Sequence, residues 1–153
     1  MRRLLTFVAI GLVLAAGAAG CQTIRSKIGL ATTIKNPDPG TPEKVLQDVL
    51  KAASNPNEEE GWVQFTGLLH TEEVSLPGLL SGWRSMKYPA IRKKASYFIT
   101  DQATASYDLM DKREEGRSLM LYVRNSQSDM PTPCKFRQDP AQGNAWKVFN
   151  SCF

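Results

Sequence analysis

The sequence has one histidine, His70, and it lacks the short patterns that mark the commonest catalytic sites. There is no Gly-x-Ser-x-Gly nucleophile turn, no His-Glu-x-x-His zinc pattern and no glycine-rich phosphate loop. One histidine and three cysteines, which have another explanation below, do not make a metal site. We therefore expect no metal and no cofactor, and the lack of a supported acid, base or nucleophile favours a non-catalytic protein.

The chain also lacks a strong excess of charge of either sign. It has 19 basic and 15 acidic residues, a formal net charge of +4. Arg2 and Arg3 form a short basic start, and without them the balance is 17 against 15, or +2. So small an excess does not argue for nucleic-acid binding, and no nucleic-acid partner is expected.

Long apolar runs are absent except near the start of the chain. Residues 4–19 carry no charge and follow the basic Met1-Arg2-Arg3. This run is shorter than the roughly 20 residues that a membrane-spanning helix needs. A basic start, an apolar run and small residues before a cut site are typical of a secretory signal peptide, which we predict over residues 1–20.

The end of this leader, Ala18-Ala19-Gly20-Cys21, resembles the lipobox of bacterial lipoproteins. The resemblance implies diacylation of the Cys21 thiol, cleavage before it and acylation of the new amino terminus. The membrane is then a partner through these acyl chains. Gln22 stands where an aspartate would be the usual inner-membrane signal, which favours the outer membrane, facing the periplasm. An ordinary signal peptide with a chance cysteine is the alternative.

Two cysteines remain, an even number in a compartment that oxidises thiols. If the last two strands form a hairpin centred near Gly143, these two cysteines lie opposite one another. Even-numbered residues then share the inward face, namely Cys134, Phe136, Trp146, Val148 and Cys152. We predict a disulfide between Cys134 and Cys152; two buried free thiols are the alternative.

Residues 21–40 are predicted to form a lipidated tether, because prolines and glycine at residues 36–40 disfavour both helix and strand. The single folded domain is expected over residues 41–153. Its first helix begins with the N-cap Thr41 followed by a proline, and its second begins after the N-cap Asn57.

A third helical stretch is predicted from about residue 77 to residue 86, with a bend or break at Tyr88-Pro89 and room for another turn over residues 90–94. From Ala95 onward the sequence has strand character. The expected strands are residues 97–99, 105–111, 118–124, 134–139 and 145–153. Residues 118–124 are apolar on both faces, which is typical of a central strand. Helices followed by an antiparallel meander predict an α+β domain, with N-terminal helices packed on a sheet of four to five strands.

This element order resembles the nuclear-transport-factor-2-like fold, also called the SnoaL-like or cone fold. The resemblance covers roughly residues 41–153 and rests on the element order, the amphipathic first helix and the terminal hairpin ending in Trp146-Lys147-Val148. It implies a curved antiparallel sheet that wraps around the leading helix and leaves a pocket. A cystatin-like helix on a sheet is the alternative.

Cone-fold enzymes generally use an aspartate, histidine or tyrosine that projects into the pocket. The resemblance therefore makes Asp108, beside Tyr107, the first catalytic candidate and Asp101 the second. A strand aspartate is more often solvated, and the alternation leaves Asp108 on either the pocket side or the surface side.

Two further residues are candidates for the pocket. His70 is a pocket candidate as the one histidine, but its position beside Thr71-Glu72-Glu73 favours a solvated histidine at a helix C-terminus. Trp83 is expected near the surface, because a glycine and an arginine flank it, with a pocket-lining role as the alternative.

The densest basic group comprises Arg84, Lys87, Arg92, Lys93 and Lys94. It either contacts anionic headgroups or an acidic partner, or it is a solvated face balanced by acids elsewhere. For the domain we expect binding or scaffolding in the envelope, with an envelope protein as partner. A cone-fold enzyme with an acidic pocket residue and a carrier of a small apolar ligand are the alternatives.

Overall fold

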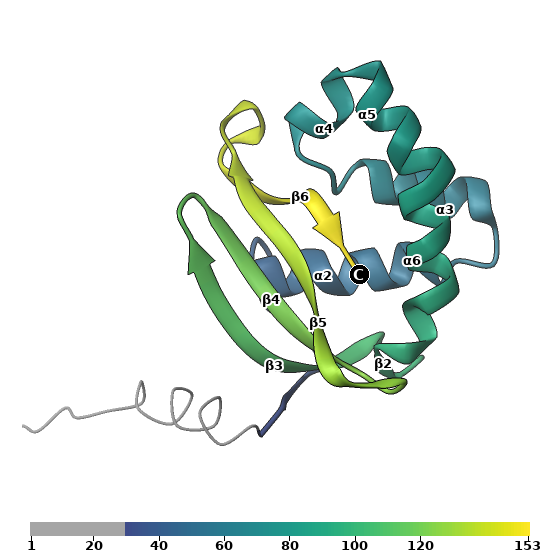
Figure 1. Cartoon of the computed structure of the whole chain (residues 1–153), viewed down its shortest axis with the longest axis vertical. Helices are drawn as coiled ribbons and strands as arrows, with labels where there is room; N and C mark the ends of the chain where they lie inside the picture. The colour runs from purple at the N-terminus through teal and green to yellow at the C-terminus, as the bar shows by residue number, and fades with distance from the viewer. Residues whose placement is uncertain (1–29) are drawn as a thin grey trace, which may run out of the picture.

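The computed structural model describes residues 30–153, in which one short strand precedes a run of helices and the other strands follow them, in agreement with the predicted α+β class (Figure 1). The predicted signal peptide and Cys21 lie outside the described residues. The helical elements are α2 (Pro42–Ala53), α3 (Glu58–Thr66), α4 (Thr71–Ser75), α5 (Pro77–Gly82), a π-helical turn (Trp83–Lys87), α6 (Tyr88–Lys94) and two short 3-10 turns (Ala95–Tyr97 and Pro140–Gln142).

Six strands form one antiparallel sheet with the order β1-β3-β4-β5-β6, and β2 pairs with the start of β3. They are β1 (Thr32–Ile34), β2 (Ile99–Asp101), β3 (Ser106–Glu115), β4 (Ser118–Asn125), β5 (Ser128–Asp139) and β6 (Ala145–Cys152). The expectation of four to five strands was too low. One added strand, β1, lies within the predicted tether and pairs with residues 107–109 of β3, so the folded part begins before residue 41.

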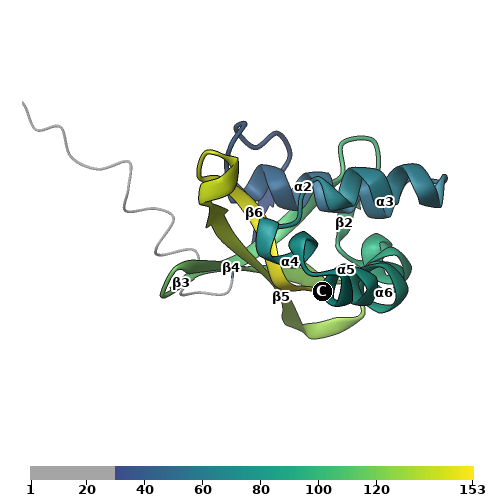
Figure 2. The ribbon, with the colours of Figure 1, turned by 90° about the horizontal axis from the view of Figure 1, so that it is seen from above.

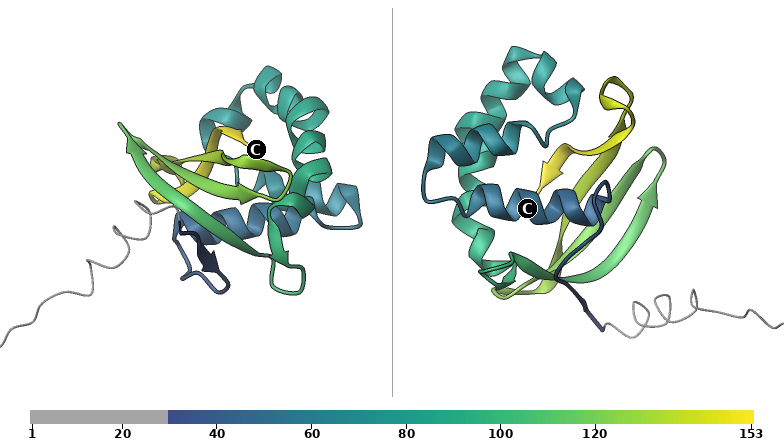
Figure 3. Two further views of the ribbon diagram at one scale, coloured as in Figure 1. Left: turned by 60° about the horizontal axis from the view of Figure 1, so that its bottom comes forward. Right: turned by 180° about the vertical axis from the view of Figure 1, so that it is seen from behind.

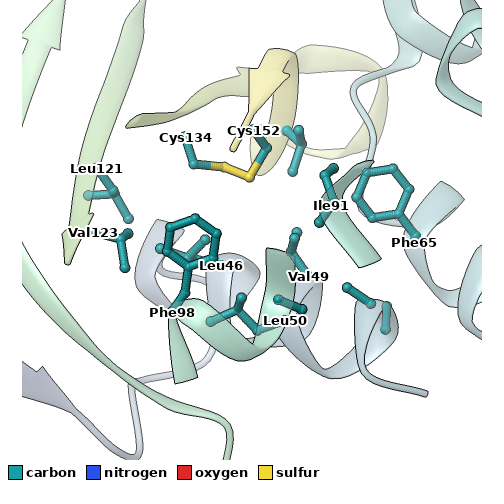
Figure 4. Close-up of a cluster of buried hydrophobic side chains, with 14 of the residues drawn as sticks. Leu46, Val49, Leu50, Phe65, Ile91, Phe98, Leu121, Val123, Cys134 and Cys152 are labelled. Carbon is teal, nitrogen blue, oxygen red and sulfur yellow. A yellow bond between two sulfur atoms is a disulfide. The ribbon is translucent and has the colours of Figure 1, made fainter. Parts of the chain in front are cut away.

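Helix α2 lies across one face of the sheet (Figure 1 and Figure 3). Thr41 caps it as predicted, since its hydroxyl accepts the Lys44 N–H at 3.2 Å. Leu46, Val49 and Leu50 are completely buried and meet apolar side chains of β4 and the terminal hairpin (Figure 4). The space between α2 and the sheet is therefore filled by side chains.

Helix α3 also begins as predicted, because the Asn57 side chain accepts the N–H groups of Glu59 and Glu60. Seen from above, α2 and α3 run along one side of the domain (Figure 2). Gly61 makes their close approach possible: a Cβ at this position would lie 2.4 Å from both the Ala52 carbonyl oxygen and the Tyr88 hydroxyl. The Tyr88 hydroxyl donates to the same carbonyl at 3.0 Å.

The third helical stretch consists of α5, the π-helical turn and α6, and α6 covers the further turn allowed at residues 90–94. Pro89 cannot donate a backbone hydrogen bond, and the chain widens to a π-helical turn immediately before α6, where the Tyr88 N–H reaches the carbonyl of Trp83. The expectation that Trp83 lies near the surface was wrong. It is fully buried within the π-helical turn, and its indole N–H donates to the Glu73 carboxylate.

The terminal hairpin follows the predicted register in part. Cys134 is the partner of Cys152, and Phe136 is the partner of Val148, with a bulge between the two pairs. All four side chains are buried, and Trp146 is partly buried. Strand β4 is central, as predicted. Strand β5 begins six residues earlier than expected, at Ser128, so its prolines lie inside a strand.

Candidate functional site

Tyr107 and Asp108 are adjacent on β3 and therefore project from opposite faces of the sheet. Tyr107 is fully buried, and its hydroxyl donates to the backbone carbonyl oxygen of Glu43 on α2 at 2.9 Å. Asp108 lies on the other face, where it accepts the Thr33 hydroxyl at 2.7 Å and lies 3.7 Å from Arg124. The structure therefore places Asp108 on the surface side of the sheet.

The side chains of Tyr107 and Asp101 both make hydrogen bonds that stabilise the fold. Burial, and then the charge of Glu43, raise the pKa of Tyr107 far above its usual range. Its phenol is neutral at physiological pH and acts as a donor between β3 and α2. Asp101 is exposed, and it accepts the Ala103 N–H at 3.1 Å and the Thr104 hydroxyl at 2.8 Å, which stabilises the turn after β2.

His70 is not the solvated residue at a helix C-terminus that the sequence favours. It is buried and is the N-cap of α4: its Nδ1 accepts the Glu72 N–H at 3.1 Å. Its backbone N–H donates to the Val148 carbonyl of β6 at 2.9 Å, and its ring meets Phe149 edge-on at 5.3 Å. The prediction was wrong because a new helix starts here and β6 covers it. Within residues 30–153, Nε2 is buried without a hydrogen-bond partner.

Asp139 belongs to the same region and was not singled out from the sequence. Its carboxylate accepts the Thr71 N–H at 2.8 Å, the Thr71 hydroxyl at 2.6 Å and the Ala141 N–H at 3.0 Å. Burial acts to raise the pKa of Asp139, but these hydrogen bonds and the nearby His70 lower it below its usual range. An aspartate followed by a proline is a common N-cap pattern, and this pattern at Asp139 and Pro140 could have identified Asp139 from the sequence.

A second polar cluster that the sequence did not reveal surrounds Trp83. Its indole N–H donates to the buried Glu73 carboxylate at 2.7 Å, and the other carboxylate oxygen accepts the Asn150 N–H at 2.9 Å. The Lys87 ammonium lies 4.1 Å from the Trp83 ring centre and donates to the Asn150 carbonyl at 2.7 Å. All of these groups hold α4, the π-helical turn and β6 together, so Trp83 does not line an open pocket.

The predicted basic group divides into two classes. Arg84 pairs with Glu59, and Lys87 contacts Trp83 and Asn150 as described above. Arg92 donates to the carbonyl oxygens of Ala53 and Asn55 at 3.2 and 2.8 Å, at the C-terminal end of α2. Lys93 and Lys94 are exposed, and their ammonium groups form no hydrogen bond or ion pair within the described part of the chain. Three of the five cations therefore support the fold, and two face solvent.

Cys134 and Cys152 form a disulfide in the structure, 18 positions apart in the chain. Both are buried, and they join β5 to β6 beside the core (Figure 4). The bond ties down the last strand one residue before the chain end. Its position among apolar side chains indicates a stabilising role rather than a reactive one.

Two hollows open on the surface of the described domain. One, of about 750 Å³, lies between residues 30–43 and β3; the other, of about 690 Å³, lies at the turn between β4 and β5. Neither contains the predicted candidates Asp108, Tyr107, His70 or Trp83. Over residues 30–153, no three or more His, Cys, Asp or Glu side chains are grouped to hold a metal ion. No helix in this part of the chain is long and apolar enough to cross a membrane.

Comparison with known protein families, with curated proteins and with solved structures found no match to this chain.

Proposed function

We propose that this chain is an envelope lipoprotein, anchored through acyl chains on Cys21 to the outer membrane and facing the periplasm, whose domain binds or scaffolds another envelope component. The lipobox-like Ala18-Ala19-Gly20-Cys21 supports the anchor. The leading helix α2 against an antiparallel sheet supports a cone-type fold for the domain.

One observation supports binding over turnover: the polar groups nominated for catalysis are used to hold the fold. Tyr107 donates to α2, His70 caps α4, and Asp108 is bonded on the outer sheet face. A catalytic group has to reach substrate in a hollow. The core beneath the sheet is filled by Leu46, Leu50 and their neighbours, which also argues against an enclosed cavity for a small apolar ligand.

The anchor is tested by replacing Cys21 with serine in the producing cell. We expect loss of acyl-chain labelling and an uncleaved or soluble product. The matched control replaces Cys134 and Cys152 with serine and keeps the label. A Cys21→Ser protein that is still processed and lipid-labelled would contradict the anchor.

The binding role is tested by crosslinking in intact envelopes. We expect the wild-type protein to give a discrete crosslinked partner that is lost in the Cys21→Ser protein. Turnover of a small molecule by the purified protein, abolished by Asp108→Asn, would overturn the non-catalytic proposal.

A further inference from the structure

Strand β3 is longer than the strand that covers its edge. Strand β1 pairs with residues 107–109, whereas residues 111–115 are paired with β4 alone among the described residues. Alternate residues of an edge strand direct their N–H and C=O groups away from the sheet. Such an edge accepts an added strand through main-chain hydrogen bonds.

The groove of about 750 Å³ runs along this open edge. Its apolar lining includes Ile34, Leu109 and Leu119, and the last of these is almost completely buried. Beside the open edge of β3 there are therefore apolar side chains, and a side chain of an added strand can pack on them.

Some of the charged side chains along the groove form ion pairs, and others do not. Lys112 and Glu114 are opposite Leu121 and Leu119 of β4 and so point to the helix-facing side. Lys112 is paired with Glu43 at 2.8 Å. Glu114, Asp38 and Lys35 are exposed and line the groove, and none of the three has an ion-pair partner within the described chain, which leaves two carboxylates against one ammonium. The groove thus offers carboxylates that a cation can complement.

Pairing with a second copy of this chain brings like charges together in the register centred on Arg113. Symmetric antiparallel pairing of two β3 edges centred on Arg113 places Arg113 against its own copy and Asp111 against Glu115, while Lys112 lies against Glu114. Like charges directly opposite one another are destabilising. In this register like charges face one another at three of the five positions, which disfavours this form of self-pairing.

We propose that this groove is a strand-addition site for an extended basic segment of a partner protein. The added strand bonds to the main chain of residues 110–115, places an apolar side chain on Leu109 and Leu119, and brings a lysine or arginine to Glu114. This inference rests on the proposed binding role and names the chemistry of the partner.

The test measures binding of short labelled peptides to the full lipidated protein in detergent. The probe has two valines and two lysines in an eight-residue threonine background, and the matched peptide has glutamate at both lysine positions. We expect at least tenfold tighter binding of the lysine peptide. Two further probes carry N-methyl groups on the odd or on the even amides, and strand addition predicts that only one of these two patterns abolishes binding.

The protein variant that reports on the site is Glu114→Lys, with Glu58→Lys at the exposed start of α3 as the matched control. We expect at least tenfold weaker binding for Glu114→Lys and no change for the control. Equal binding of the lysine and glutamate peptides, binding of both N-methylated probes, or an unchanged Glu114→Lys would each overturn the site. Binding that appears only after deletion of residues 22–29 would also overturn it and assign the groove to the chain itself.

The failure of this site is distinguishable from the failure of the proposed function. If Glu114→Lys keeps its lipid label and its crosslinked partner, the lipoprotein and its binding role stand and the strand-addition site falls. If the wild-type protein has neither label nor partner, the proposed function falls whatever the peptides do.

Discussion

The indole N–H of Trp83 donates to the Glu73 carboxylate at 2.7 Å, and both side chains are buried. The second oxygen of the same carboxylate accepts the N–H of Asn150, whose φ of 67° lies in the left-handed region. One carboxylate therefore fixes a helical turn and an unusual strand conformation together. A buried carboxylate is tolerated only when its oxygens are satisfied, as they are here.

Replacing Glu73 with glutamine is expected to destabilise the domain by about 1 to 3 kcal/mol, because an amide offers one acceptor oxygen for two donors. Chemical denaturation followed by tryptophan fluorescence measures the loss. Glu72→Gln is the matched control, since Glu72 forms an exposed pair with Arg137 and should change stability by less than about 0.5 kcal/mol. Equal effects of the two changes would contradict a special role for Glu73.

Asp139→Asn should change how stability depends on pH. The fold lowers the pKa of Asp139, so the carboxylate contributes stability above its unfolded pKa of about 3.9 and loses it as the pH falls through the lower folded value. We expect the wild-type protein to be more stable than the variant at pH 5 to 7, with the difference shrinking below about pH 4. Urea unfolding of both proteins from pH 2 to 7 measures this difference.

Loss of the Cys134–Cys152 bond should lower the melting temperature. Closing a loop with a separation of 18 residues is worth about 3 kcal/mol in the chain-entropy model. The double serine variant should therefore melt earlier without losing its lipid label. Mass spectrometry under non-reducing conditions should find no alkylatable thiol at these positions after denaturation; two labelled thiols would contradict the bond.

The division of the basic group predicts opposite outcomes for neighbouring residues. Arg92→Gln should lower stability by about 1 kcal/mol, because it removes donors from carbonyl oxygens at the end of α2. Lys93→Gln and Lys94→Gln should leave stability unchanged. If the exposed lysines contact anionic headgroups, the double lysine variant should lose salt-sensitive vesicle binding, at about 1 kcal/mol per cation. Absence of wild-type binding at low ionic strength would assign both lysines to solvent.

The elements that the sequence predicted well are those determined by neighbours in the chain. Thr41 and Asn57 cap their helices through N–H groups two or three residues away, and an apolar stripe then directs the helix to the core. The two apolar faces of residues 118–124 correctly indicated the central strand. The loop between β5 and β6 likewise brought Cys134 opposite Cys152.

The residues that the sequence misplaced depend on distant partners. His70 is buried because β6, some 78 positions later, accepts its backbone N–H. Trp83 is buried because Glu73 and Asn150 meet beside it. Strand β1 has three residues, too few for a period-two pattern, and forms only because β3 lies alongside. The conformational preferences of neighbouring residues do not reveal these contacts, because their partners lie far away in the sequence.

The early start of the folded part would limit how far a domain anchored through Cys21 reaches from the membrane. Thr32 is already paired to β3 and stands eleven positions after Cys21. A fully extended chain advances at most about 3.6 Å per residue, so a lipid on Cys21 would keep this edge of the sheet within about 40 Å of the bilayer surface. If the domain is anchored at Cys21 and its partner is also held at the membrane, the two meet almost in two dimensions. A weak contact at the domain surface then becomes sufficient, because both partners are concentrated in the same thin layer.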